Sequence, residues 1–131
     1  MSLFDSQLAW LANRGTEASI AGWEPERFGN AHPSIVPYET FPTSSAHVVV
    51  AVGTDAQFRQ LCEAIGLPDA PDDPRFATNP QRVADKEALI AELEPLFAAR
   101  GRDELVETLR AAGVPAAPVQ DAGEVWSHPD R

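Results

Sequence analysis

Closely spaced prolines constrain this sequence most strongly, in the segment GNAHPSIVPYETF from Gly29 to Phe41. Pro33 and Pro37 lie inside the segment, and Pro42 follows it directly. Each proline fixes its own φ and disfavours the α region for the residue before it. The segment joins a helical N-terminus to a predicted β-strand. It is therefore too stiff to be an ordinary flexible linker.

The N-terminal residues predict one long helix from Leu3 to about Ala21, ended by Gly22. Its apolar positions recur at helical spacing, at Phe4, Leu8, Leu11 and Ala12. Trp10 lies off this stripe, which indicates a second contact surface.

Two strands are predicted after the connector. HVVVAV, His47 to Val52, is rich in β-branched valines and is typical of a strand buried mostly on both faces. YETF, Tyr38 to Phe41, predicts a shorter partner strand, and the PTSSA segment between them predicts a hairpin turn. Because this turn has no glycine, we expect it to be wider than a tight two-residue turn.

A capping box gives the clearest local signal. The Thr54 hydroxyl can accept from the Gln57 amide while the Gln57 side chain reaches back. Apolar residues follow at helical spacing, and Gly66 stands where a left-handed C-terminal residue belongs. The pattern predicts a helix from Asp55 to Ile65.

The remaining residues predict further helices. Asn79, followed by a proline, is interpreted as a cap, and the helical pattern continues to Phe97. Pro95 is expected to kink or break this helix, because its ring displaces a backbone hydrogen bond. Another helix is predicted near Asp103 to Ala112. The following VPAAPV segment, residues 114–119, contains two prolines and predicts an edge strand or an extended segment.

A last short helix is predicted after Asp121, which is a favoured N-cap residue. The expected fold class is therefore α+β. A small antiparallel or mixed sheet packs with several helices, and the long N-terminal helix precedes it.

The composition of the 131 residues excludes several function classes. A net charge of −10 provides no basic patch for nucleic acid or an acidic membrane surface. No apolar run is long enough to span a membrane, and the N-terminus lacks a signal pattern, so we expect a cytoplasmic protein. The single cysteine, Cys62, lies in an apolar helical pattern and is expected in the core. The three histidines lie far apart, so no metal site is expected.

No familiar catalytic motif is present, so no catalytic residue is assigned. The one candidate for substrate binding is the junction Gly53, Thr54 and Asp55, between the valine-rich strand and the capped helix. Backbone N–H groups at such a junction can face an anion. The alternative interpretation is a plain capped helix.

Five blocks of the sequence, in order, resemble the class III CoA-transferase family, which includes formyl-CoA transferase, carnitine-related CoA-transferases and α-methylacyl-CoA racemases. The blocks cover nearly the whole chain: SLFDSQLAWLANRG, GNAHPSIVPYETFPT, VVVAVGTDAQFRQLCEAIGLP, DPRFATNPQRVADKEAL and AAGVPAAPVQDAGEV. By this resemblance, residues 1–28 are a linker helix associated with a large CoA-binding domain, and residues 29–131 are the small α+β domain. The stiff connector then fixes the position of the small domain across the active-site cleft.

The resemblance also implies what this chain does not contain. The family's catalytic aspartate lies upstream of the region resembled, and neither Asp5 nor Asp55 aligns with it. The expected function is that of a small-domain fragment of an enzyme that transfers CoA between an acyl-CoA and a carboxylic acid, inactive alone. The alternatives are a fragment of an α-methylacyl-CoA racemase and a non-catalytic interaction module of the same fold.

The resemblance implies no cofactor beyond the CoA thioester, which is a substrate of the parent enzyme. The expected partners are acyl-CoA in that enzyme and a second chain, with which the protein forms a homo-oligomer or associates through the N-terminal helix. The residues implied to face the acyl-CoA are Gly53, Thr54 and Asp55.

Overall fold

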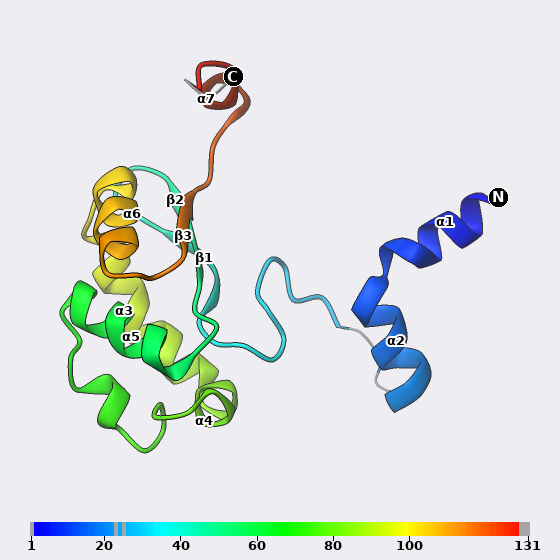
Figure 1. Ribbon diagram of the computed structural model, residues 1–131, viewed down its shortest axis with the longest axis horizontal. Helices are drawn as coiled ribbons and strands as arrows, with labels where there is room; N and C mark the ends of the chain where they lie inside the picture. Colours follow the sequence, from blue (N-terminus) through cyan, green and yellow to red (C-terminus); the bar gives the residue numbers. More distant parts are fainter. Residues whose placement is uncertain (1, 23, 25, 129–131) are drawn as a thin grey trace.

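A computed structural model describes residues 2–22, 24 and 26–128, and Figure 1 shows the arrangement of their elements. The elements, in chain order, are α1 (Leu3–Trp10), α2 (Ala12–Ala21), β1 (Tyr38–Pro42), β2 (His47–Ala51), α3 (Asp55–Ile65), a short 3₁₀ turn (Ala70–Asp72), α4 (Asn79–Ala84), α5 (Lys86–Ala98), α6 (Arg102–Ala111), β3 (Ala116–Pro118) and α7 (Ala122–Trp126). Within these described residues, no helix combines the length and the apolar character needed to cross a membrane.

The sheet is antiparallel throughout, with the strand order β1–β2–β3. Tyr38 pairs with Ala51 at one end of the hairpin, and Pro42 pairs with His47 at the other. The turn therefore spans residues 43–46, wider than two residues, as the missing glycine predicts. The hairpin, the edge position of β3 and the α+β class are all confirmed.

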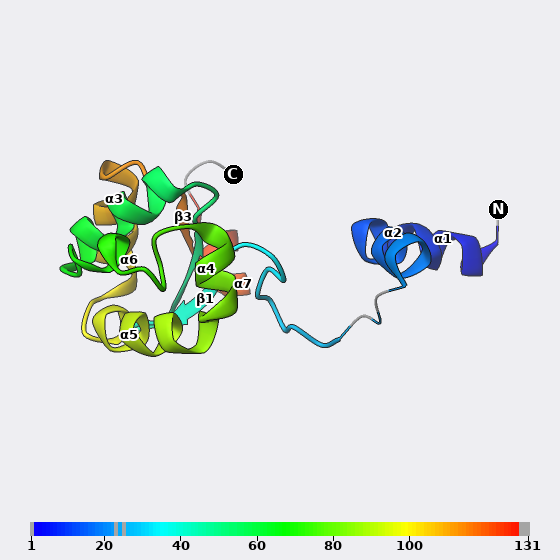
Figure 2. The same cartoon turned by 90° about the horizontal axis from the view of Figure 1, so that it is seen from below.

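In the part of the chain that the structure describes, helices cover only one face of this sheet. Phe41, Val48 and Val50 point into the core and are at most 1% exposed. Figures 1 and 2 show α3, α5 and α6 together on this side of the sheet. Val49 and Ala51, on the opposite face, are only partly buried. The prediction that the valine-rich strand is buried mostly on both faces is therefore wrong, because no helix of the described residues packs against the second face.

Helix α3 agrees with its predicted bounds, Asp55–Ile65. Both bonds of the capping box between Thr54 and Gln57 are present. Gly66 ends the helix with φ of 88°, a left-handed conformation that glycine adopts without a steric penalty. The buried face of the helix contains Cys62, which confirms its expected place in the core. Helix α6 and the capped helix α7 also lie where the sequence predicts them.

The helical region before Phe97 is divided at a different place from the one predicted. The chain leaves the helix at Asp85, where φ is −107° and ψ is 31°, so that α4 and α5 are separate. Helix α5 continues through Pro95, so the predicted break there is absent. Its buried face contains Leu93 and Phe97 on either side of the proline, and this packing maintains the helix.

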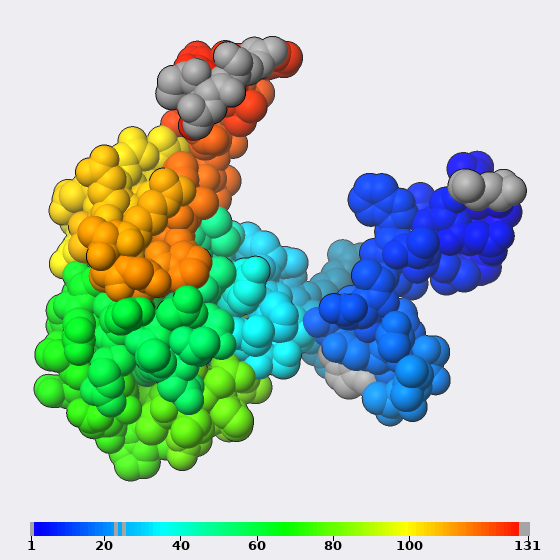
Figure 3. Space-filling model, viewed as in Figure 1, coloured from blue at the N-terminus to red at the C-terminus, as the bar shows by residue number. Residues whose placement is uncertain are grey.

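The long N-terminal helix is not observed. Ala12 has φ of 44°, which ends α1 and starts α2 in a new direction. No residue of α1 or α2 is buried, so packing energy does not keep the segment straight. Asn13, Gly15 and Thr16, which follow the break, also have low helix propensities. Figure 3 shows this helical pair joined to the body by a narrow neck.

Candidate functional site

The guanidinium of Arg82 joins three segments that lie far apart in the sequence. The side chain is fully buried, with 0% of the residue exposed. Its Nε donates to the Val36 carbonyl at 2.8 Å, and its Nη1 donates to the Phe76 carbonyl at 2.9 Å. Its Nη2 donates to Asp55 Oδ1 at 2.8 Å. Arg82 therefore links the connector, the loop before α4 and the first turn of α3.

The surroundings of Arg82 match its charge and its shape. The guanidinium carbon lies 4.3 Å from the centre of the Phe58 ring, a cation–π distance. The Asp55 side chain is 55% exposed, so it balances the buried charge while it keeps part of its own hydration. Arg82 thus avoids the large cost of burying an unpaired charge.

Asn79, in the first turn of α4, ties down the same connector. Its Oδ1 accepts from the Val36 N–H at 3.1 Å, and its Nδ2 donates to the Ser34 carbonyl at 2.8 Å. Its own backbone N–H donates to Asp55 Oδ1 at 3.1 Å. The N-cap of α4 is Thr78, so Asn79 is not the cap that the sequence predicts. As the next residue, its side chain is free to bind the connector.

The connector is also held along strand β1. Asn30 Nδ2 donates to Thr40 Oγ1 at 2.6 Å. The His32 backbone N–H donates to the Tyr38 carbonyl at 2.8 Å, and the two rings stack with centres 5.2 Å apart. The stiffness predicted from the prolines is therefore accompanied by specific bonds along the segment.

The structure gives each residue of the Gly53–Asp55 junction a local role. The N–H groups of Gly53 and Thr54 both donate to Gln57 Oε1, at 2.9 and 3.2 Å. Thr54 caps α3, and Asp55 pairs with Arg82. Gly53 does not have a positive φ, and a Cβ built on it lies 3.5 Å from its nearest neighbour, Gln57 Oε1. Acyl-CoA binding at this junction remains a prediction.

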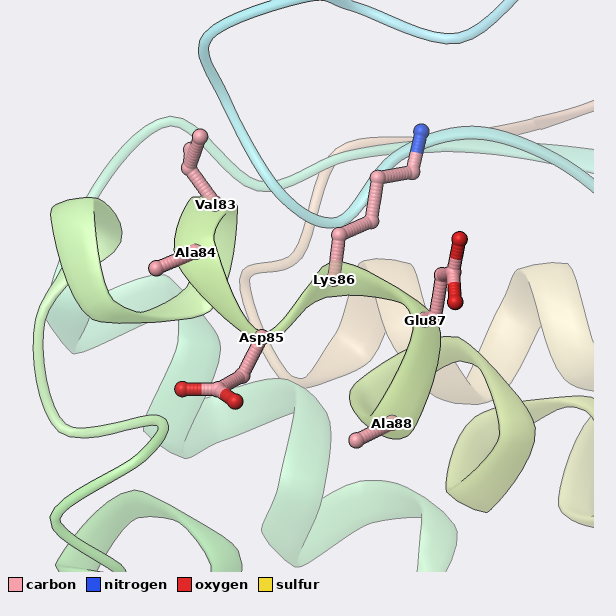
Figure 4. Close-up of a pocket in the computed structure, with 6 residues that line it drawn as sticks. All are labelled: Val83, Ala84, Asp85, Lys86, Glu87 and Ala88. Carbon is pink, nitrogen blue, oxygen red and sulfur yellow. The ribbon is translucent and has the colours of Figure 1, made fainter.

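A depression of about 430 Å³ lies at the α4–α5 junction, where Figure 4 shows its lining residues. Lys86 reaches toward β1, and its Nζ lies 3.0 Å from Glu39 Oε1, whereas Asp85 points to the other side. The other charged residues of the lining, Asp85 and Glu87, are acidic. Among the described residues of this lining, Lys86 is the one cation and is already paired, so no free positive charge is left there to attract an anion.

Two other side chains of types that often act in catalysis, Cys62 and Glu124, have structural roles here. Burial raises the pKa of the Cys62 thiol to about 12, so this cysteine is not a nucleophile at neutral pH. The hydrogen bond from Arg102 lowers the pKa of Glu124 to about 2 and fastens α7 to the start of α6. In the described ranges, no three His, Cys, Asp or Glu side chains are grouped so that they could hold a metal ion.

Sequence reasoning missed Arg82, the bonds from Asn79 to the connector and the ring contact of His32. The available signal for Arg82 is its spacing, because it falls at helical intervals before the buried Leu89 and Leu93. A charged residue on an apolar stripe indicates a buried ion pair. The sequence shows no partner for it, since Val36 and Asp55 come from remote segments.

Comparison with known proteins shows extensive similarity. The sequence profile of CoA-transferase family III matches residues 1–131. A succinate–glutarate CoA-transferase of Agrobacterium fabrum is 39% identical over 129 residues, which cover 98% of this chain and 32% of that protein. An acetyl-CoA:oxalate CoA-transferase of Acetobacter aceti is 35% identical over 129 residues, with 98% of this chain and 33% of that protein covered.

A solved structure agrees with these sequence matches. The crystal structure of a CAIB/BAIF family protein from Brucella suis superposes with a TM-score of 0.87 and 40% identity, and it covers 99% of this chain and 34% of that one. The chain thus spans about a third of the length of the proteins that it matches.

Two arginine–aspartate pairs of the same chemistry allow a matched test of the Arg82 network. Arg82→Met leaves two buried carbonyls without their donor, and each such group costs about 1–3 kcal/mol, so we expect a loss of about 2–6 kcal/mol in the free energy of unfolding. Arg59→Met breaks the exposed pair with Asp72, which water and salt screen, and should leave the free energy of unfolding nearly unchanged. Urea unfolding measures both, and similar losses in the two variants would contradict the central role of Arg82.

The junction before α3 gives a second pair of variants. Thr54→Ala removes the cap and should lower the free energy of unfolding by about 1 kcal/mol. Gly53→Ala should change it by less than about 0.5 kcal/mol, because no positive φ is required and the added Cβ makes only an ordinary contact. Thermal melting with circular dichroism tests both variants. A large loss for Gly53→Ala would show that this glycine is a structural requirement.

Proposed function

Since this chain belongs to CoA-transferase family III, we propose that it forms the small domain of an enzyme that transfers CoA from an acyl-CoA to a carboxylic acid. One observation carries the proposal: relatives named for CoA transfer align with 98% of the chain. Because those relatives are about three times as long, the activity is proposed for a protein that contains this segment together with the rest of the family sequence.

The proposed chemistry assigns the covalent step to a part of the family sequence outside this chain. A carboxylate nucleophile that forms a mixed anhydride can divide an acyl transfer into two easier steps. The residues described here supply orientation. The bonds of Arg82 and Asn79 to the connector set the direction in which the small domain faces. Correct orientation of the reacting groups accounts for a large part of the rate in such reactions.

The acid that accepts CoA is proposed to be a short dicarboxylic acid. Two relatives are named for succinate, glutarate or oxalate, each of which has two carboxyl groups. These names also favour a transferase over an α-methylacyl-CoA racemase.

The junction Gly53, Thr54 and Asp55 is proposed to face the acyl-CoA. It stands at the end of β2 and the start of α3, and Gly53 has no side chain that would keep a ligand away from the backbone. Since the N–H groups of Gly53 and Thr54 bond to Gln57, contact with the thioester would involve the backbone surface rather than free donors.

The protein is proposed to act in the cytoplasm, where disulfides are rare, as its single cysteine favours. Association is proposed to use helix α1, on which Leu3, Phe4 and Trp10 are 88%, 71% and 85% exposed. Apolar side chains gathered on one short helix favour an interface with protein.

Transfer activity can be tested in a chimera. Residues 1–131 replace the aligned segment of the Agrobacterium fabrum relative, and CoA transfer from succinyl-CoA to glutarate is followed. We expect the chimera to turn over, whereas the isolated chain should show no transfer above the uncatalysed rate. A chimera that folds and melts like the parent but does not turn over would refute the proposed function.

The same chimera tests the junction. Gly53→Ala should leave melting unchanged and reduce acyl-CoA turnover, because the added methyl group would separate the thioester from the backbone. Leu67, which follows the C-cap of α3, provides a control position far from the junction. Leu67→Met keeps its size and hydrophobic character and should not affect turnover. Normal kinetics in the Gly53→Ala chimera would reject a role in the cleft.

Association through α1 can be tested on the isolated chain. We expect sedimentation to show dimers or larger species that dissociate when Phe4 and Trp10 are replaced by serine. Replacing the exposed Val125 and Trp126 of α7 by serine provides the control and should leave association unchanged. A wild-type chain that stays monomeric at high concentration would contradict the prediction.

A further inference from the structure

The sheet face that points away from the core helices, here called the outer face, contains an open depression of about 340 Å³. Its floor is apolar and is formed by Val49 and Ala51 of β2 and Ala117 of β3. Tyr38 and Arg110 also line it, with the loop that leads into β3. This volume falls at the lower end of the range typical of small-ligand sites.

Arg110 supplies a fixed positive charge beside the apolar floor. Its Nε donates to the Ala116 carbonyl at 2.8 Å, which holds the guanidinium against β3. Within the described ranges its two Nη nitrogens make no hydrogen bond, and no acidic side chain pairs with it. By contrast, Arg59, Arg75, Arg82 and Arg102 all form ion pairs. Arg110 therefore presents its two Nη nitrogens beside apolar residues, in a chain with a net charge of −10.

Tyr38 forms a second wall of the depression, and its position is restrained. Its ring stacks on His32 at an interplanar angle of 20°, and its carbonyl accepts the His32 N–H. The bond from Asn30 to Thr40 holds the same part of the connector beside the outer face. The connector therefore fixes one side of the depression, while the turn after α6 fixes the other.

The chemistry of these walls selects one class of ligand. A short methylene chain fits the apolar floor, and a guanidinium binds a terminal carboxylate through two parallel hydrogen bonds. A polyphosphate such as the nucleotide end of CoA would need several cations, but the lining contains one. We propose that the outer face binds the distal carboxylate of the dicarboxylic acid, with Arg110 as the residue that determines specificity. This inference rests on the proposed function for the identity of the acid.

Binding can be measured on the isolated chain without any turnover. Glutarate is titrated into ¹⁵N-labelled protein, and the amide shifts of Ala51, Ala116 and Ala117 are followed. We expect these shifts to saturate with glutarate, and to be weak or absent with its uncharged diamide. Arg110→Gln should weaken glutarate binding by about tenfold or more, the effect of losing a charge-assisted hydrogen bond. Arg110→Lys keeps the positive charge but cannot form two parallel hydrogen bonds with a carboxylate. Its affinity for glutarate should therefore lie between those of the wild type and Arg110→Gln.

Arg59→Gln is the matched control, because it removes an exposed arginine on α3 that does not line the depression. Its glutarate affinity should equal that of the wild type. Equal affinity in Arg110→Gln and wild type, or no saturating shift at the three amides, would overturn the proposal. Concentration-dependent shifts at the same amides without glutarate would show that a second copy of the chain covers this face, and would overturn it as well.

The chimera separates this inference from the proposed function. There, Arg110→Gln should raise the KM for glutarate by about tenfold and leave that for butyrate unchanged, since butyrate has no distal carboxylate. If the chimera is active but Arg110→Gln leaves its KM for glutarate unchanged, the outer-face site is refuted and the proposed function is not. An inactive chimera whose isolated segment still binds glutarate through Arg110 refutes the proposed function alone.

Discussion

The buried guanidinium of Arg82 is the interaction on which the arrangement of this chain depends. Removing such a charge from water is costly, and the cost is offset only when a partner of opposite charge and further hydrogen bonds satisfy the buried group. Here each of the three guanidinium nitrogens donates one hydrogen bond, to Val36, Phe76 and Asp55, so none of these segments can shift without leaving the buried charge less well satisfied. The connector, the loop before α4 and the first turn of α3 are consequently one mechanical unit.

Local signals in the sequence were sufficient for most of the elements. The Thr54–Gln57 capping box, the valine-rich strand and Gly66 define α3 and the hairpin, because these features act through neighbouring residues. The contacts of Arg82 could not be predicted, since its partners come from remote segments. The two-sided burial expected for β2 failed for a related reason: the valines do not indicate how many faces the helices cover.

The N-terminal pair and the body show what tertiary packing contributes to a helix. Helix α5 contains Pro95 yet stays continuous, because buried side chains hold it on both sides of the proline. Helices α1 and α2 contain no proline, yet the chain turns at Ala12 in a segment without any buried residue. In α5, burial therefore outweighs the unfavourable proline. At Ala12, where nothing is buried, the low helix propensity of the neighbouring residues is enough to end the helix.

The prolines at the edges of the sheet affect how this protein behaves among other copies of itself. In the observed register, Ala116 and Pro118 direct their backbone groups outward from β3. Pro118 has no N–H, and the Ala116 carbonyl is occupied by Arg110. On β1, the Tyr38 carbonyl is occupied by His32, and Pro42 lacks a donor. Both edges are thus poor templates for an additional strand, which protects the small sheet against amyloid-like, edge-to-edge aggregation.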